Sequence, residues 1–217
     1  MTIELFAHPF SSYCQKVLIA LYENDVPFIF RMLEDAGVGE ELASLWPMKR
    51  FPILRENGRV VLESSIVIEY LHVRHGGPVK LIPEDPDLAL EARMLDRFFD
   101  NYVMTPQGKF VFDALRSADS RDPCGVEEAR KMLDTSYDWL DQHMAGRTWA
   151  VGESFTLADC AAAPSLFYAD WTHRIPEHYA SLLAYRARLL QRPSFARAVD
   201  EARRFRHYFP LGAPDRD

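Results

Sequence analysis

The segment SSYCQKV, residues 11–17, places two hydroxyls and a thiol where a helix is expected to begin. The β-type run TIELFA precedes it and the helical run VLIALYEN follows it. Ser12 and Gln15 have the spacing of a capping box, which predicts a structural role for Ser12. Ser11 would then lie just before the helix, where its hydroxyl and the helix dipole favour an anion such as a ligand thiolate. An ordinary turn residue is the alternative for Ser11.

Cys14 is the thiol of this segment and falls in the first turn of the expected helix. A cysteine near a helix N-terminus can have a lowered pKa and be reactive. It can also pack as a small apolar residue, which is the more frequent role. The sequence leaves both interpretations open.

Phe51 and Pro52 precede an expected strand. Proline cannot donate to a strand ladder, so it suits the first position of a strand. A cis bond here would let Phe51 offer its backbone N–H and C=O to an extended peptide ligand. The alternative is a trans proline that closes the loop.

A second group of polar residues surrounds the junction Glu63-Ser64-Ser65, between a hairpin and a helix. Free backbone N–H groups and a hydroxyl at such a junction suit a ligand carboxylate, and Glu63 could hold an ammonium group. Lys49 and Arg50 could meet a second carboxylate. An ordinary helix cap and two solvated loop cations would also explain these residues.

An alternating N-terminal part is expected to position these groups. Asn57-Gly58 between two β-type runs predicts a hairpin. The predicted order is β-α-β-α-β-β-α, a mixed sheet with helices on its faces. The other expected strands are 3–7 and 28–33, and the expected helices are 13–24, 40–45 and 65–74.

The chain after this part is predicted to be all-helical. We expect an α/β domain at 1–78, a proline-containing linker at 79–87 and a helical domain at 88–217. Thr156 and Asp159 have capping-box spacing, which gives Asp159 a role in folding. The expected helices are 88–102, 126–144, 156–168, 179–190 and 193–204.

Composition limits the functional classes. The 217 residues carry a formal net charge of −7, which argues against a nucleic-acid partner. Three dispersed cysteines favour a reducing compartment, and the start of the chain has no signal-peptide pattern. We therefore expect a cytoplasmic protein with no membrane span and no metal, because no ligand spacing for a metal is present.

Three blocks together resemble one family: HPFSSYCQKVLIALYEN, WPMKRFPILRENGRVVLESSIVIEYL and FTLADCAAAP. The chain resembles a cytosolic glutathione S-transferase of the serine type, with zeta-, tau- and omega-like features. The resemblance implies a thioredoxin-like βαβαββα domain followed by an all-α domain. It also implies a cytoplasmic homodimer that uses glutathione as cosubstrate.

The same resemblance assigns the site. Ser11 would hydrogen-bond the thiol of glutathione, with Ser12 as the second candidate. The implied glutathione-binding positions are Lys49, Arg50, Phe51, Pro52, Glu63 and Ser64. The fourth and sixth helices would line the electrophile pocket, with Phe99, Tyr102, Val103, Phe110 and Trp171 as candidates, although large apolar residues at helical spacing are commonly core.

The implied reaction is attack of the glutathione thiolate on a small hydrophobic electrophile. Two alternatives remain open from the sequence. One is a glutathione-dependent isomerase or thiol reductase on the same fold. The other is a non-catalytic binding or regulatory protein that has retained the fold.

Overall fold

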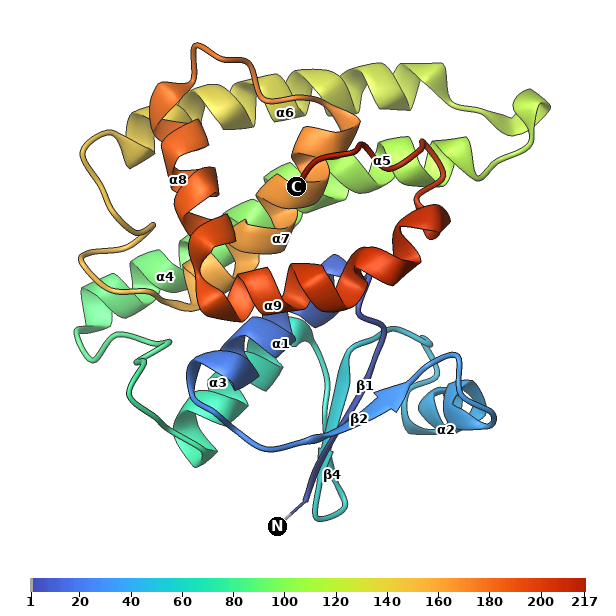
Figure 1. Cartoon of the computed structure of the whole chain (residues 1–217), viewed down its shortest axis with the longest axis vertical. Coiled ribbons are helices and arrows are strands. Elements are labelled where there is room, and N and C mark those ends of the chain that lie inside the picture. Colours follow the sequence, from blue (N-terminus) through green and yellow to red (C-terminus); the bar gives the residue numbers. More distant parts are fainter. Residues whose placement is uncertain (1) are drawn as a thin grey trace.

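A four-stranded mixed sheet forms the N-terminal part of the molecule (Figure 1). The computed structural model describes residues 2–217. The strand order is β2-β1-β3-β4, with β1 parallel to β2 and antiparallel to β3. The predicted order of strands and helices is confirmed. The strands are β1 (Ile3–Ala7), β2 (Ile29–Met32), β3 (Ile53–Glu56) and β4 (Arg59–Val61).

Alternate residues of β1 pack on opposite faces of this sheet, as the two-residue period of a strand requires. Leu5 faces the main core, whereas Phe6 packs with Val38 and Leu42 of helix α2 (Val38–Leu45). Helices α1 (Ser12–Glu23) and α3 (Ser64–Arg74) complete the N-terminal part. The sheet is therefore covered on both faces, which explains why nearly all of β1 is buried.

Helices form the rest of the chain. Helix α7 is buried along most of its length and packs against α1 and α4. Helix α9 lies across α1 (Figure 1). The helices are α4 (Pro86–Phe98), α5 (Thr105–Ala114), α6 (Pro123–Met144), α7 (Leu157–Thr172), α8 (Ala180–Gln191) and α9 (Pro193–Ala202).

Between α4 and α5 the structure differs from the helix predicted at 88–102. Helix α4 ends at Phe98, and the π-helical segment η1 (Phe99–Met104) leads directly into α5. Pro106 stands in the first turn of α5, where its missing N–H is tolerated. Helix α5 was not predicted, and it proves important for the site described below.

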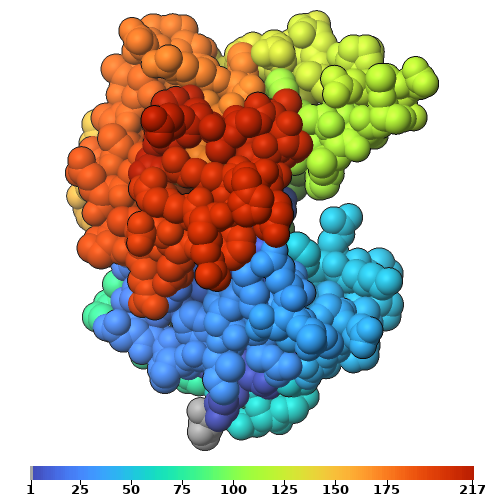
Figure 2. Space-filling model, turned by 45° about the vertical axis from the view of Figure 1, so that its right-hand side comes forward, coloured from blue at the N-terminus to red at the C-terminus, as the bar shows by residue number. Residues whose placement is uncertain are grey.

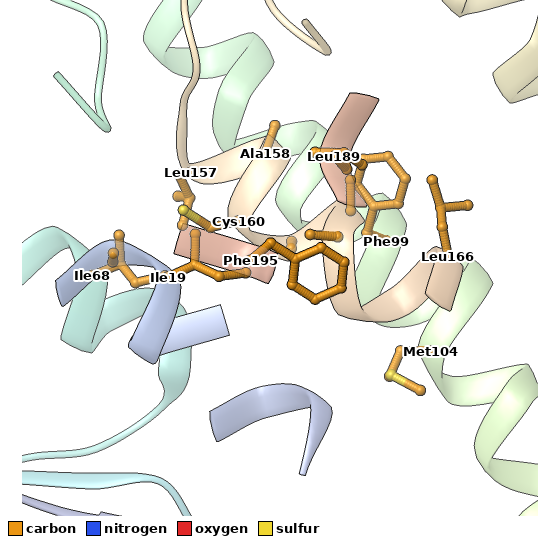
Figure 3. Packing of buried hydrophobic residues seen from close by; sticks show 14 of the residues in the cluster. Ile19, Ile68, Phe99, Met104, Leu157, Ala158, Cys160, Leu166, Leu189 and Phe195 are labelled. Atoms are coloured by element: carbon orange, nitrogen blue, oxygen red, sulfur yellow. The ribbon is translucent and has the colours of Figure 1, made fainter. Parts of the chain in front are cut away.

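One hydrophobic core joins the sheet part to the helical part. Ile19 of α1 and Ile68 of α3 belong to the same cluster as Leu157 and Phe195 (Figure 3). The close-up shows these side chains meeting between the two parts. The boundaries proposed at 78 and 87 stay a prediction; α3 ends at Arg74 and α4 begins at Pro86.

The capping box predicted at the start of α7 is confirmed. The buried Asp159 carboxylate accepts hydrogen bonds from Thr156 N at 2.8 Å, Ala150 N at 2.9 Å and Tyr185 Oη at 2.6 Å. Burial raises the pKa of Asp159, while these hydrogen bonds oppose the shift. Asp159 thus fixes the start of α7 and ties it to α8.

The end of the chain folds back on the helical part. After α9 the 3-10 segment η3 (Arg203–Tyr208) continues to a tail whose Asp217 pairs with Arg203 and Arg206. Arg216 of the tail pairs with Asp170 of α7. Within residues 2–217, none of the helices combines the length and hydropathy needed to cross a bilayer.

Candidate functional site

A cavity of about 740 Å³ lies between the sheet part and the helical part. Figure 2 shows a hollow at the right of the molecule, between the green helices and the blue-to-cyan sheet part. The sheet part contributes six of the predicted site residues: Ser11, Ser12, Lys49, Arg50, Phe51 and Glu63. Residues separated by about fifty positions in the sequence therefore meet at one site.

Ser11, not Ser12, caps helix α1, which corrects the sequence prediction. Ser11 has an extended backbone, and its Oγ accepts a hydrogen bond from Cys14 N at 3.4 Å. Ser12 is the first helical residue. The predicted capping box does not form, because the Gln15 side chain bonds Pro9 O at 2.9 Å. The helix therefore begins one residue earlier than its spacing indicated.

The cap leaves the Ser11 proton available. A hydroxyl has one donor and two acceptor positions, and Cys14 N uses an acceptor position. Ser11 lines the cavity, so its O–H is placed to donate to a ligand there. The positive end of the α1 dipole favours an anionic acceptor at this point.

The loop before Ser11 is held from two sides. Gln15 Nε2 donates to Pro9 O, and Tyr168 Oη of helix α7 donates to Phe10 O at 2.9 Å. Gln15 Nε2 also donates to Tyr168 Oη at 3.2 Å. These bonds connect the loop to the helical part and fix the position from which the Ser11 hydroxyl projects.

The loop before β3 brings two cations to the cavity. Lys49 has a left-handed backbone with φ of 52°, and both Lys49 and Arg50 are exposed. Neither forms an ion pair with another residue of the chain between positions 2 and 217. The Phe51–Pro52 peptide bond is cis; Phe51 lines the cavity, whereas Pro52 is buried and does not line it.

The start of α3 forms the next part of the wall. Glu63 precedes the helix with φ of 68° and ψ of 121°, a conformation that ordinary residues rarely adopt. No side chain caps α3, so the backbone N–H groups at Ser64 and Ser65 lack an intrahelical partner. Ser64 is buried directly behind Glu63. Unpaired N–H groups beside a carboxylate can bind a ligand that carries both an acid and an amine.

The five residues proposed for the electrophile pocket do not line this cavity. Phe99, Val103 and Phe110 are buried in the core, and Tyr102 is exposed beside Phe98. Trp171 packs between Phe167 and Phe209. The helix predicted at 88–102 is followed directly by η1 and α5, and α5 presents other residues to the cavity. The helical part contributes Met104, Thr105, Gln107, Gly108, Lys109, Val111, Phe112, Tyr168, Tyr208, Phe209 and Pro210.

Two family models match this chain. The N-terminal domain of glutathione S-transferases matches residues 5–79, and the C-terminal domain matches residues 125–188. The chain belongs to the glutathione S-transferase family. The predicted membership and the predicted fold, a thioredoxin-like domain followed by an all-helical domain, are both confirmed.

Relatives of this family member carry different functions in their names. A stringent starvation protein A homolog of Coxiella burnetii is 26% identical over 200 residues, covering 91% of each chain. FtsZ-localized protein A of Caulobacter vibrioides is 26% identical over 210 residues, covering 90% of each. The crystal structure of a Methylobacterium radiotolerans glutathione S-transferase in complex with glutathione sulfonate superposes with a TM-score of 0.80 at 27% identity, covering 92% of this chain and 95% of that one.

Cys14 is not a reactive thiol in this glutathione S-transferase fold. The side chain is fully buried, and burial raises the pKa of the thiol to about 12. His8 N donates to its Sγ at 3.5 Å. Cys14 therefore packs as a small apolar residue, the more frequent of the two roles that the sequence allowed.

The sequence did not reveal a buried ionic cluster behind the site. Lys16 of α1 is 1% exposed, and its Nζ bonds Asp100 Oδ2 and Ser65 Oγ, each at 2.9 Å, and also contacts Asp96. Ser65 Oγ donates to Asp96 at 2.8 Å. Lys16 within the apolar run CQKVLIAL was the available signal, because α1 is covered on every side. The cluster links α1, α3 and α4.

A second, larger cavity of about 1040 Å³ lies between β2 and α9. Of the predicted site residues, all of which lie in the described chain, none lines it. Among residues 2–217 no cluster of three metal-ligating side chains occurs. The cavity between the two parts therefore remains the candidate site.

Proposed function

We propose that this protein is a glutathione S-transferase that holds glutathione in the cavity and stabilises its thiolate with Ser11. The observation that carries the proposal is the arrangement of the cavity walls. The sheet side presents the Ser11 hydroxyl, two cations and the carboxylate of Glu63, and the helical side presents apolar and uncharged polar side chains together with Lys109. The glutathione ligand of the Methylobacterium relative supports the same assignment.

Each end of glutathione has a complementary group in this cavity. The γ-glutamyl ammonium would pair with Glu63, and its carboxylate would accept from the free N–H groups at the start of α3. The cysteinyl backbone would lie along Phe51, before Pro52. The glycyl carboxylate would meet Lys49 or Arg50, which have no carboxylate partner in the described chain.

The thiol is then activated by preferential stabilisation of its anion. A free thiol has a pKa of about 8.5, so only a few per cent is thiolate at about pH 7. Lowering the pKa by about two units requires roughly 2.7 kcal/mol. A charge-assisted hydrogen bond from Ser11 together with the α1 dipole is of this size. The thiolate attacks an electrophile held against the helical wall.

Binding is tested by retention on immobilised glutathione and by calorimetry. We expect Glu63→Ala to weaken glutathione binding roughly tenfold to hundredfold, since the ion pair with the γ-glutamyl ammonium is lost. Glu127→Ala on α6, which lies outside the cavity and pairs with Arg130, is the control and should bind normally. A native protein that fails to bind glutathione would exclude the proposed function.

A non-catalytic binding protein is the second candidate. It is favoured by two relatives, the stringent starvation protein A homolog and FtsZ-localized protein A, whose names describe no transferase. Glutathione binding without conjugation of any of a set of aryl halides, enones and epoxides would favour this candidate.

The reductase alternative is disfavoured by the burial and raised pKa of Cys14. Conversion of a cis dicarboxylate alkene to its trans isomer, dependent on glutathione, would identify an isomerase.

We further propose that the protein forms a homodimer through α3 and α4. These helices expose Leu88 and four further large apolar side chains, and Arg93 joins α4 to Glu69 of α3 at 2.8 Å. Residues four or seven positions apart share a helix face, so the four side chains form one patch. They are Ile66, Val73, Leu90 and Met94.

The dimer proposal is tested by sedimentation of charged variants. We expect Leu90→Glu to shift the protein from dimer to monomer, because a carboxylate would be buried at the interface without a partner. Leu115→Glu at the end of α5 is a matched control, since Leu90 and Leu115 are both 66% exposed. A native protein that sediments as a monomer at all concentrations would refute the dimer.

A further inference from the structure

Besides Gln107 and Val111, helix α5 lines the cavity with Thr105, Gly108, Lys109 and Phe112. Their spacing of three, four and seven positions is that of a single helix face. Lys109 is the single charged side chain that the helical part contributes to the cavity, counting residues 2–217. The other side chains of this wall carry no charge, so Lys109 is the group on the helical side that can recognise a negative charge.

Lys109 forms one long, exposed ion pair within the protein. Lys109 Nζ lies 3.9 Å from Asp122 Oδ2, beyond hydrogen-bond distance. Asp122 has its own structural role, because its Oδ1 caps α6 by accepting from Gly125 N at 2.8 Å. An exposed pair of this length holds Lys109 weakly, so its three N–H donors can turn toward a ligand.

The surroundings of Lys109 suit a planar apolar group. Phe112 is 62% exposed, although it lines the cavity together with Phe209 and Pro210. Gly108 has no side chain, and a Cβ built there would lie 3.5 Å from the Phe112 ring. The bare backbone of Gly108 thus forms a flat shelf beside the ring, within one helical turn of Lys109.

The charges of the cavity support the same conclusion. The cavity lining carries three cations, Lys49, Arg50 and Lys109, and one carboxylate, Glu63. It therefore has a surplus of positive charge, although the whole chain has a formal net charge of −7. In the proposed function Lys49 or Arg50 binds the glycyl carboxylate of glutathione, and Glu63 binds its ammonium group. These groups lie on the sheet side, which leaves Lys109, on the helical side, for the second substrate.

We propose that the second substrate is a planar apolar electrophile that carries a carboxylate, which Lys109 binds while the ring lies on Gly108 and Phe112. This inference rests on the proposed function, whose cavity it shares. With an aryl chloride the glutathione sulfur forms a bond to the ring carbon. The carbon–chlorine bond then breaks, chloride leaves with the electron pair, and the thiol proton passes to solvent.

The test compares a chlorodinitrobenzoate with the corresponding chlorodinitrobenzamide, which has the same shape and no charge. We expect the native protein to prefer the benzoate roughly fivefold in kcat/KM at low ionic strength, typical of a partly exposed ion pair. Lys109→Gln should bring the ratio close to one, and added salt should reduce the native ratio. Lys131→Gln on α6, outside the cavity, is the matched control and should retain the native ratio.

A binding measurement separates this inference from the proposed function. The glutathione conjugates of the two compounds are prepared chemically, and their Kd values are measured with native protein and Lys109→Gln. Tighter binding of the benzoate conjugate by the native protein, lost in Lys109→Gln, would support the inference. Absence of turnover in the same protein would refute the proposed transferase activity but not this inference. Equal Kd values in the native protein would overturn the inference, whether or not conjugation occurs.

A second variant tests the shelf. Gly108→Ala should fold, because its Cβ would make an ordinary contact with Phe112. We expect weaker binding of both conjugates by a similar factor, with the benzoate preference retained. Unchanged affinity for both conjugates would show that the ring does not lie on Gly108 and would overturn that part of the proposal.

Discussion

Replacing Ser11 with alanine should raise the apparent pKa of the glutathione thiol by about one to two units. At about pH 6.5 we expect conjugation to slow roughly tenfold to hundredfold, because less of the bound thiol is ionised. The rate of the variant should approach the native rate as the pH rises above the new pKa. The measurement is kcat/KM against pH for a neutral aryl halide.

The structure also gives Ser11 a capping role, which the experiment must separate from the chemical role. Ser11 Oγ accepts from Cys14 N, so Ser11→Ala should cost about 1 kcal/mol of stability as well. Ser11→Thr keeps both the hydroxyl and the cap and should keep a lowered thiol pKa. A pH profile that stays unchanged in Ser11→Ala but moves in Ser12→Ala would transfer the role to Ser12.

Replacing Lys16 with methionine should lower the free energy of unfolding by about 3–5 kcal/mol. Met fills the space of the lysine side chain out to Cε but leaves Asp96 and Asp100 buried without their main cation. Arg97 remains near both carboxylates but is half exposed, so it compensates only in part. Urea unfolding of the native protein and the variant gives the difference.

The stability lost in Lys16→Met should depend on pH and should be smaller at lower pH. Burial already raises the pKa of Asp100, while Lys16 opposes that shift. Without Lys16 the folded-state pKa of Asp100 rises further above its unfolded value. The folded state then binds more protons than the unfolded state, so stability increases as the pH falls. The difference in unfolding free energy between the native protein and Lys16→Met should therefore become smaller as the pH falls from about 7 to 5.

Two further variants check the cause. Asp96→Asn and Asp100→Asn, added to Lys16→Met, should restore part of the lost stability because the uncompensated charges are removed. Lys131→Met on α6 is the control for loss of an exposed lysine and should change stability by no more than about 0.5 kcal/mol. If Lys16→Met itself fell within this range, the cluster would not be an important source of stability.

Local patterns were sufficient for most of the elements. The period of two residues in β1, the Asn57-Gly58 hairpin and the Thr156–Asp159 capping box each depend on residues near one another in sequence. The start of α1 was misplaced by one residue because Gln15 bonds Pro9 and Tyr168 instead of capping the helix. Tyr168 is 153 positions away, and spacing within the helix carries no information about it.

The sequence by itself determined the family, the order of strands and helices, and a set of polar residues around Ser11, Phe51 and Glu63. Motifs of contiguous residues carry this information, because caps, hairpins and strand periods are set by neighbours in the chain. Only the tertiary structure decided which apolar residues face the cavity and which fill the core. That choice depends on the phase of α5 after η1 and on the return of the chain at Phe209 and Pro210. The same packing covers every face of α1 and so turns Lys16, a residue expected in water, into the centre of a buried ionic cluster.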